Sequence, residues 1–212
     1  LGFSALKVNA IAAQMGRGKT ERITANAMGA LAATLGRFSM DVCVYMSQNF
    51  DFISFPDHLT TGSSIMPHKK NPDIFELIRG KSALIQGLGN DFALLGQNLP
   101  SGYHREMQLF KGKILEGINE LKDCLTMLNS AIKEVRVRTE IMADAKYTYA
   151  FTVDALNELV QQGVPFRDAY KQVGQQVEEG SFKATKKVAH THIGSLGNLA
   201  LDKIQEKFDK QY

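Results

Sequence analysis

Residues 61–73 read Thr61-Gly62-Ser63-Ser64-Ile65-Met66-Pro67-His68-Lys69-Lys70-Asn71-Pro72-Asp73, and they carry the strongest signal in this 212-residue chain. Serine hydroxyls, lysine side chains and the start of a helix fall within one short segment. Lysine cations and the backbone N–H groups of a helix N-terminus both favour bound anions. Such a set suits a substrate with several carboxylates. The segment is not a Walker A phosphate loop, because it lacks the Gly-Lys-Ser/Thr ending.

A serine in this loop acts as a base only if its surroundings favour the alkoxide, since a serine hydroxyl is a poor base at neutral pH. Lys69 and Lys70 bring positive charge close by, and the amides that follow Pro72 bring oriented dipoles. The same groups would hold a carboxylate and stabilise charge that develops on it. An ordinary capped helix after a polar turn uses the same residue types. The length and specificity of the whole string favour the functional interpretation.

Helical patterns dominate on both sides of this loop, and strand signals are almost absent. Residues 21–48 are rich in Ala, Met and Leu with many small residues, which predicts a helix packed closely against its neighbours. After the loop, Asn71 as N-cap and Pro72 as first helical residue predict the start of a second helix. That helix should run to about Leu95, with Gly96 just past its end. We therefore expect an all-α fold, built as a bundle of long helices.

A third helix is predicted from about Tyr103 to Ile132. Its apolar positions recur in steps of 4, 3, 4, 3 and 4 residues, as in a coiled-coil seam: Ile114, Ile118, Leu121, Leu125, Leu128 and Ile132. A seam this regular predicts helix bundling, and packing between subunits is one form that the bundling can take.

Beyond residue 138 the predicted helices become short, and terminal Gly and Pro residues mark their ends. They cover about residues 149–162, 165–179 and 198–208, with Asn198 as a candidate cap of the last. We place a domain boundary between a central helical bundle over residues 1–142 and a small C-terminal helical domain over residues 143–212.

Composition excludes several classes of protein. The net charge is +3 and the basic residues are scattered, whereas a nucleic-acid-binding protein usually shows a basic stripe with interleaved aromatic residues. Cys43 and Cys124 lie in apolar helical contexts and are interpreted as buried free thiols, which suits a reducing compartment. We find no apolar run of the ~18 residues that a membrane span requires and no signal peptide. The sequence predicts a cytoplasmic protein that binds neither nucleic acid nor membrane.

The string Gly-Ser-Ser-x-Met-Pro-x-Lys-x-Asn-Pro at residues 62–72 resembles the signature loop of the fumarase/aspartase superfamily at every fixed position. Members of that superfamily eliminate fumarate from a succinyl compound by breaking a C–N or C–O bond. The resemblance implies that Ser63 is the catalytic base, which removes a proton from the carbon beside a carboxylate. It implies that Lys69 and Asn71 bind that carboxylate in its aci form, and that Ser64 contacts the substrate.

The residues around this string add further expectations and one departure. In the superfamily, a glutamate at the offset of Glu76 orients the histidine that transfers a proton to the leaving group, although a first-turn glutamate is often only a partner of the helix dipole. Lys70 is interpreted as a solvated or structural charge. Argininosuccinate lyases often have glutamine where this chain has His68, and adenylosuccinate lyases have histidine. Substrate contact and a surface position therefore both stay open for His68.

Two blocks resemble the argininosuccinate lyases in particular. Residues 73–81 match Asp-x-x-Glu-Leu-Ile-Arg-Gly-Lys, and residues 99–111 match Leu-Pro-x-x-Tyr-x-x-(Asp/Glu)-Met-Gln-x-x-Lys. The resemblance implies that Tyr103, Gln108 and Lys111 contact the substrate. Gln108 and Lys111 are three residues apart and share a helix face. The alternatives are a helix-start aromatic residue for Tyr103 and a surface charge for Lys111.

The resemblance implies an enzyme of arginine biosynthesis and the urea cycle that cleaves argininosuccinate to arginine and fumarate, without cofactor or metal. It also implies a homotetramer built on long helices, in which each active site draws on three subunits. Two upstream signature regions of the superfamily, one with the expected histidine, are not found. We therefore expect roughly the second half of the enzyme, with little or no activity alone. The alternatives are another fumarate-releasing lyase, chiefly adenylosuccinate lyase, and a noncatalytic helical relative or oligomerisation fragment.

Overall fold

The computed structural model describes residues 2–184 and 190–211, and the chain divides into two compact units, residues 1–138 and 139–212. The boundary expected from the sequence lies between residues 142 and 143. In the described part, sheet structure is limited to two-residue strands and a few isolated bridges, and helices make up most of the rest. The expected all-α fold is therefore confirmed.

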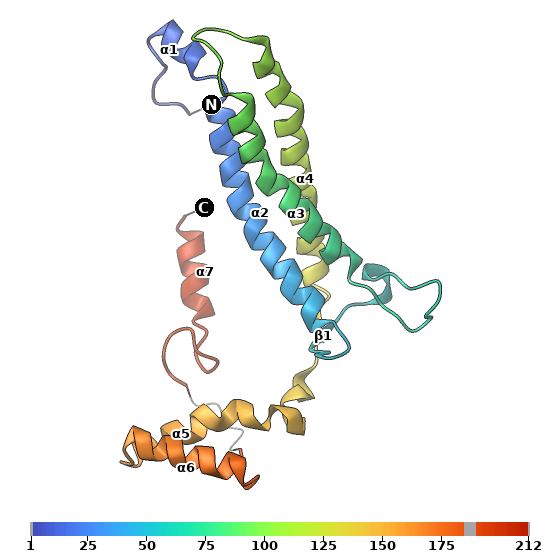
Figure 1. Ribbon diagram of the computed structural model, residues 1–212, viewed down its shortest axis with the longest axis vertical. Helices are drawn as coiled ribbons and strands as arrows, with labels where there is room; N and C mark the ends of the chain where they lie inside the picture. Colours follow the sequence, from blue (N-terminus) through green and yellow to red (C-terminus); the bar gives the residue numbers. More distant parts are fainter. Residues whose placement is uncertain (1, 185–189, 212) are drawn as a thin grey trace. The chain divides into compact units, whose positions relative to one another are not determined.

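Three long helices run side by side in the first unit: α2 (Lys19–Tyr45), α3 (Asp73–Leu95) and α4 (Leu109–Ile132) (Figure 1). A short helix, α1 (Ala10–Met15), precedes them. The connections hold β1 (Ile53–Ser54) and two 3-10 helices, η1 (Asp57–Leu59) and η2 (Arg105–Gln108). After α4, β2 (Arg136–Val137) pairs antiparallel with β1, with Ile53 opposite Val137.

Small residues allow α2 and α3 to approach closely, as the composition of residues 21–48 predicted. A Cβ atom added to Gly36 would lie 3.3 Å from the Cβ of Ser82. A Cβ added to Gly89 would lie 2.0 Å from the Oδ1 of Asn26, so a larger residue there would displace that side chain. Each helical glycine lowers helix propensity by about 1 kcal/mol relative to alanine, and the close packing of the helices offsets that cost.

Apolar side chains from the three helices form a core that continues along the bundle. Its central cluster is Met28, Ala32, Leu35, Ile78, Ile85, Leu121 and Cys124. A second cluster lies where α3 begins and comprises Val42, Phe55, Leu59, Phe75 and Ala131. At the other end of α3, the rings of Phe92 and Phe110 meet edge to face with centroids 4.8 Å apart. Both ends of α3 are therefore fixed by buried aromatic residues.

The predicted seam of α4 is divided between two stripes. Leu121 is buried, and Ile114 and Leu128 pack against the core. The remaining members of the seam are exposed to between 37% and 39%: Ile118, Leu125 and Ile132. Because the members of each set are seven residues apart, they form two parallel stripes on the helix. One stripe serves the bundle, and the other leaves apolar surface uncovered in this chain.

The start of α3 differs from the prediction. Pro72, not Asn71, occupies the N-cap position, and its carbonyl accepts the N–H groups of Phe75 and Glu76. The Asn71 side chain instead donates to the carbonyl of Gly62 at 3.3 Å. The end of α3 at Leu95 with Gly96 as C-cap agrees with the prediction.

The second unit contains the short helices expected from the sequence. They are η3 (Thr139–Ala143), η4 (Ala145–Phe151), α5 (Thr152–Gln161), α6 (Phe166–Glu178) and α7 (Leu201–Asp209). Their core is formed by Leu156, Ala169, Val173 and Phe182. Asn198 does not cap α7, because its side chain donates to the carbonyl of Thr191 at 2.8 Å and α7 begins later.

By length and composition alone, one helical stretch, Ala10–Tyr45, is long and apolar enough to cross a membrane, which corrects the sequence analysis. A core helix of a soluble protein passes the same test. Here α2 contributes Met28, Ala32 and Leu35 to the core that it shares with α3 and α4. We therefore treat it as a bundle helix.

Phe75 offers a direct test of the core at the start of α3. Its side chain is fully buried, with 0% exposure, so Phe75→Ala should lower the free energy of unfolding by about 3–5 kcal/mol. Leu77 lies two residues further along the same helix and is 63% exposed, so Leu77→Ala should change it by less than about 1 kcal/mol. Urea denaturation followed by circular dichroism measures both. Equal losses in the two variants would contradict the assigned core.

Candidate functional site

Residues 61–71, hereafter the Ser63 loop, leave the bundle and return to it at one point (Figure 1). Thr61 and Asn71 face each other as an antiparallel bridge. Asn71 N–H donates to the Thr61 carbonyl at 2.8 Å, and Thr61 N–H donates to the Asn71 carbonyl at 3.2 Å. The Thr61 hydroxyl also donates to the Asp73 carboxylate. These bonds and the Asn71–Gly62 bond close the loop at its neck.

Within the loop, Ser63 is half-buried and accepts two backbone hydrogen bonds. The N–H groups of Ile65 and Met66 each donate to its Oγ at 3.2 Å. Amide donors aimed at an oxygen stabilise negative charge on it, and because they are already oriented they need no rearrangement when the charge forms. These donors would stabilise an alkoxide if Ser63 lost its proton, which is what a serine base requires.

A cavity of about 630 Å³ lies between the loop, the end of α2 and the start of α3. Lys69, Asn71 and Glu76, all expected site residues, line it. Ser63 and Ser64 belong to the same loop but are not among the lining residues. The structure thus brings three of the expected residues to one cavity, and neither serine is among the residues that line it.

Several lining residues have no counterpart among the expected site residues. They come from the end of α2 and the segment after it: Cys43, Met46, Ser47, Gln48, Asp51, Ile53, Ser54 and Phe55. The residue types alone do not mark them, because Ser, Gln and Asp are common in any loop. The usable signal is their place in the chain, since they end the helix that leads into the loop.

The two adjacent lysines of the loop have different electrostatic surroundings. Lys70 forms an ion pair with Asp57, and the hydrogen bond from Lys70 lowers the pKa of the Asp57 carboxyl. Both lysines line the cavity, but Lys69 makes no ion pair within residues 2–184 and 190–211. Lys69 is therefore the cation that is free to meet an anion in the cavity.

Glu76 is exposed and lines the cavity, as does His68. Two other histidines of this unit are engaged elsewhere: His58 Nε2 lies 3.1 Å from Glu134 Oε1, and His104 Nε2 lies 2.8 Å from the carbonyl of Pro100. Among the residues that the structure describes, no group of three or more His, Cys, Asp or Glu side chains is placed to hold a metal ion.

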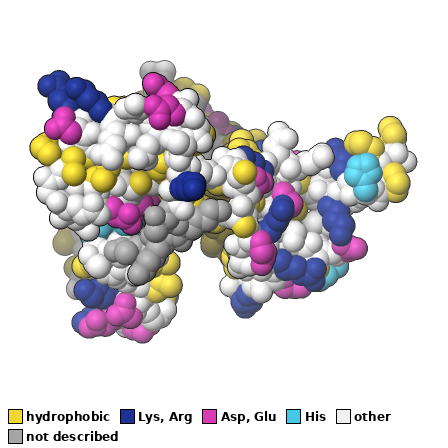
Figure 2. Space-filling view, turned by 90° about the horizontal axis from the view of Figure 1, so that it is seen from below, with side chains coloured by type: hydrophobic (Ala, Val, Ile, Leu, Met, Phe, Trp, Pro, Cys, Tyr) yellow, Lys and Arg dark blue, Asp and Glu magenta, His cyan; other side chains and the backbone are white. Residues whose placement is uncertain are grey.

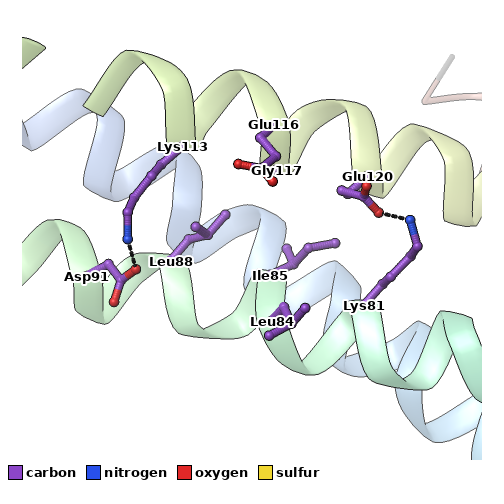
Figure 3. Close-up of a pocket in the computed structure, with 9 residues that line it drawn as sticks. All are labelled: Lys81, Leu84, Ile85, Leu88, Asp91, Lys113, Glu116, Gly117 and Glu120. Atoms are coloured by element: carbon purple, nitrogen blue, oxygen red, sulfur yellow. Dashed lines mark hydrogen bonds and ion pairs between the residues drawn. The ribbon is translucent and has the colours of Figure 1, made fainter. Parts of the chain in front are cut away.

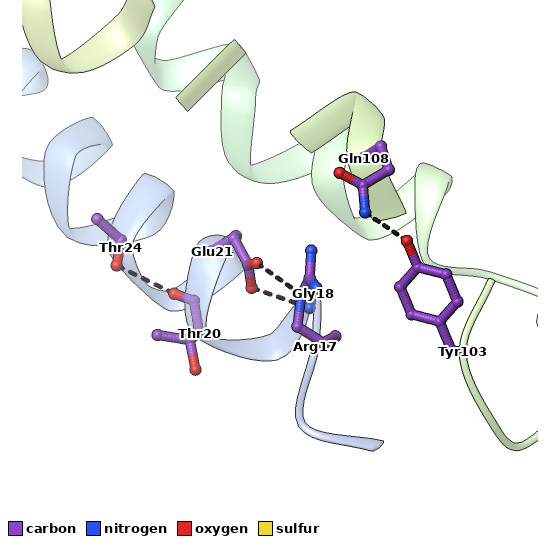
Figure 4. A network of polar contacts seen from close by, with 7 residues as sticks. All are labelled: Arg17, Gly18, Thr20, Glu21, Thr24, Tyr103 and Gln108. Atoms are coloured by element: carbon purple, nitrogen blue, oxygen red, sulfur yellow. Dashed lines mark hydrogen bonds and ion pairs between the residues drawn. The ribbon is translucent and has the colours of Figure 1, made fainter. Parts of the chain in front are cut away.

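The other expected substrate residues lie at the far end of the bundle. Tyr103, Gln108 and Lys111 follow the end of α3, and Gln108 Nε2 donates to the Tyr103 hydroxyl (Figure 4). The 23 residues of α3 separate this group from the Ser63 loop by about 34 Å, at 1.5 Å per residue. Within one chain, the two groups of residues cannot contact the same small molecule.

The first turn of α2 also lies at this far end. A Cβ added to Gly18, whose φ is +82°, would come within 3.3 Å of the Phe110 ring, so the start of α2 packs directly on α4. Glu21 accepts the Gly18 N–H at 2.9 Å and lies 3.5 Å from Arg17 Nε (Figure 4). Arg17 is thus a charged residue beside the Tyr103 group that the sequence analysis did not select.

A second hollow of about 410 Å³ lies between α3 and α4 (Figure 3). Its floor is apolar, and the ion pairs Lys81–Glu120 and Lys113–Asp91 cross it. The hydrogen bond to Glu120 raises the pKa of Lys81. None of the expected site residues lines this hollow. On the face shown in Figure 2, basic and acidic side chains are intermingled, in agreement with the scattered charges of the sequence.

The known proteins that this chain resembles are lyases. The family model described as Lyase matches residues 14–87. The chain is 52% identical over 204 residues to the argininosuccinate lyase of Parabacteroides distasonis, covering 96% of this chain and 46% of the relative. It is 35% identical over 213 residues to the argininosuccinate lyase of Sorangium cellulosum, covering 99% of this chain and 49% of the relative. The chain thus spans about half the length of the curated relatives that it matches.

Solved structures support the fold. A crystal structure of EDDS lyase in complex with formate superposes with a TM-score of 0.71 at 21% identity, covering 85% of this chain and 37% of the other. A fumarate lyase:delta crystallin from Brucella melitensis superposes with a TM-score of 0.68 at 20% identity, covering 83% of this chain and 39% of the other. At these identities, the likeness shows a shared long-helix bundle.

The rate at which Cys43 is alkylated tests the burial of its thiol at the cavity. It is half-buried against the cavity, and burial raises the pKa of its thiol, although the charge of Arg79 acts in the opposite direction. Because the thiolate is the reactive form, iodoacetamide should modify Cys43 more slowly at pH 7.5 than an exposed peptide thiol. The rate should keep rising through pH 9. Peptide mass spectrometry of the alkylated chain measures this, and a rate that levels off below pH 8 would contradict it.

Proposed function

Because the chain belongs to the lyase family that includes the argininosuccinate lyases, we propose that its Ser63 loop serves the elimination of fumarate from argininosuccinate, which leaves arginine. The observation that carries the proposal is one loop in which two amide N–H groups hold the Ser63 Oγ and in which Lys69 and Asn71 line a cavity. Since the chain covers 46% of its relative, the activity is proposed for the whole protein. We also propose a cytoplasmic location, which the free thiols of Cys43 and Cys124 support.

In the proposed reaction, Ser63 in its alkoxide form removes a proton from the carbon beside a succinyl carboxylate. The electron pair of that C–H bond moves into the carboxylate and gives an aci-carboxylate with two negative charges. Lys69 and Asn71 would stabilise this dianion more strongly than the ground-state carboxylate, which is what accelerates the step. The pair then forms the C=C bond of fumarate, the C–N bond breaks, and the leaving guanidino nitrogen takes a proton.

Asn71 can combine this role with its bond at the neck. Its amide nitrogen carries two N–H donors, and one of them reaches the Gly62 carbonyl. The second N–H remains for a substrate carboxylate. Ser64 is the other proposed contact on this loop, and Glu76 would orient a proton-transferring histidine that another part of the protein provides.

The separation of the two groups of site residues supports a shared active site. Tyr103, Gln108 and Lys111 lie about 34 Å along α3 from the Ser63 loop. If they hold the same substrate, they must come from another copy of the chain. The exposed stripe of Ile118, Leu125 and Ile132 on α4 supports packing between copies. We therefore propose a homo-oligomer, most simply the homotetramer that the family resemblance implies.

Fumarate release, followed by ultraviolet absorbance, tests the reaction. The chain is assayed alone and together with the part of the Parabacteroides distasonis lyase that it does not cover, first with argininosuccinate and then with adenylosuccinate. We expect little release from the chain alone and release from argininosuccinate after the addition. Release from adenylosuccinate only would assign the alternative lyase, to which His68 points. A folded complex that releases no fumarate from either substrate would contradict the proposal.

Ser63→Ala tests the base. Removing a general base usually lowers the rate by about 10²- to 10⁴-fold, so kcat in the complemented assembly should fall by that factor. Ser64→Ala changes a neighbouring hydroxyl in the same loop and should mainly raise KM. If the two variants lose kcat equally, Ser63 is not the base.

Mixed oligomers test the shared site. In the complemented assembly, Ser63→Ala and Lys111→Met chains should each be nearly inactive, because each lacks one side of every site. Refolded together, they should regain a fraction of the activity, since some sites then combine an intact Ser63 loop with an intact Tyr103 end from different copies. If well-folded mixed oligomers recover no activity, the Ser63 loop and the Tyr103 group do not act together at one shared site.

A further inference from the structure

The 3-10 helix η1 is fixed to the bundle just before the Ser63 loop begins. Its Leu59 is buried in one cluster with Phe55 and Phe75, whose ring centroids are 5.0 Å apart. Its His58 Nε2 lies 3.1 Å from Glu134 Oε1, near the end of α4. The backbone of Asp57, the first residue of η1, is therefore anchored by contacts on both sides.

The loop itself has no comparable anchor. Among the described residues, every hydrogen bond made by residues 63–69 has its partner inside the loop. At its tip, Ile65 is 86% exposed. The position of the loop is therefore set at its neck, by the Thr61–Asn71 bridge, the Thr61–Asp73 bond and the Lys70–Asp57 ion pair.

The Lys70–Asp57 pair is the neck bond that reaches back to η1. The other two bonds join the strands of the loop to each other or to the first turn of α3. Because Lys70 sits on the returning strand of the neck, its pairing with Asp57 ties that strand to η1. Lys69, the next residue back, carries the cation that faces the cavity.

We propose that Asp57 is a positioning residue for the elimination: by holding Lys70, it fixes the neck at the angle that presents Lys69 and Ser63 to the substrate. This inference rests on the proposed function of the Ser63 loop. The Asp57–Lys70 ion pair would also have a second effect. Asp57 neutralises Lys70, so the substrate carboxylate meets one unpaired lysine, Lys69, and adopts one orientation. Asp57 does not touch the substrate.

The first arm of the test measures the hydrogen exchange of the loop amides and does not depend on enzyme activity. Amide hydrogen exchange is followed over residues 61–71 of the full chain for the unaltered protein, Asp57→Asn, Asp57→Glu and Asp91→Asn. Asp57→Asn should speed exchange of the neck amides of Thr61 and Asn71 by about two- to fivefold, the range expected for an exposed ion pair. Asp57→Glu keeps the charge and should stay near the unaltered rate. Asp91→Asn breaks a similar exposed pair, with Lys113, and should leave the loop unchanged.

The second arm measures fumarate release in the complemented assembly. Asp57→Asn should lower kcat by about ten- to a hundredfold, the loss that a small misplacement of reacting groups causes, with a smaller change in KM. Asp57→Glu should recover most of that loss, and Asp91→Asn should match the unaltered protein. Circular dichroism checks that each variant is folded, which the exposure of Asp57 favours.

The two arms separate the possible failures. If the unaltered assembly releases no fumarate while Asp57→Asn still loosens the neck, the proposed function fails and the role of Asp57 in holding the loop stands. If the unaltered assembly is active and Asp57→Asn keeps its kcat, or changes KM alone, Asp57 is not a positioning residue. Unchanged exchange at Thr61 and Asn71 in Asp57→Asn would also overturn the inference.

Discussion

Burial of Phe75 is the constraint on which the site end of this molecule depends. The ring is the third residue of α3 and meets side chains from each neighbouring segment: Val42 of α2, Phe55 and Leu59 before the loop, and Ala131 of α4. Burying a phenylalanine side chain contributes about 1.5–3 kcal/mol. That contribution holds the two ends of the Ser63 loop against one core, so a loop of exposed polar residues starts and ends at defined positions.

The length of α3 is the second constraint, and it separates the site residues into two groups. A straight helix cannot bring its two ends together, so the motif at its start and the motif beyond its end stay about 34 Å apart. The apolar stripe that α4 leaves exposed has the same seven-residue spacing as the stripe in the core. A regular apolar stripe of this kind is the pattern by which helices pack against one another, and it supports the proposed packing between copies. Both features agree with sites assembled between copies.

The sequence predicted the long helices well, because their signals are local. The end of α3 at Gly96 follows from a glycine stop signal, and the close packing of α2 follows from its small residues. The failures involve contacts that only the folded chain creates. Asparagine is a common N-cap residue, but in the closed loop the Asn71 side chain donates a hydrogen bond to the Gly62 carbonyl instead. Lys70 and Asp57 each look like ordinary surface charges, and their pairing depends on where η1 is anchored. Motifs likewise selected Ser63 and Tyr103 as candidates without giving the distance between them.

The exposure of the Ser63 loop sets a further condition on any chemistry there. Two amide N–H groups can stabilise an alkoxide at Ser63, but their effect is strong only where water is excluded, since water screens the same charge. In this chain, Ile65 at the loop tip is 86% exposed and Met66 is 42% exposed. Apolar side chains at the tip of a polar loop gain free energy when another surface covers them. A surface that buries Ile65 and Met66 would also exclude water from the N–H groups that these residues donate to Ser63. Covering the tip and activating Ser63 as the proposed base would then be physically linked.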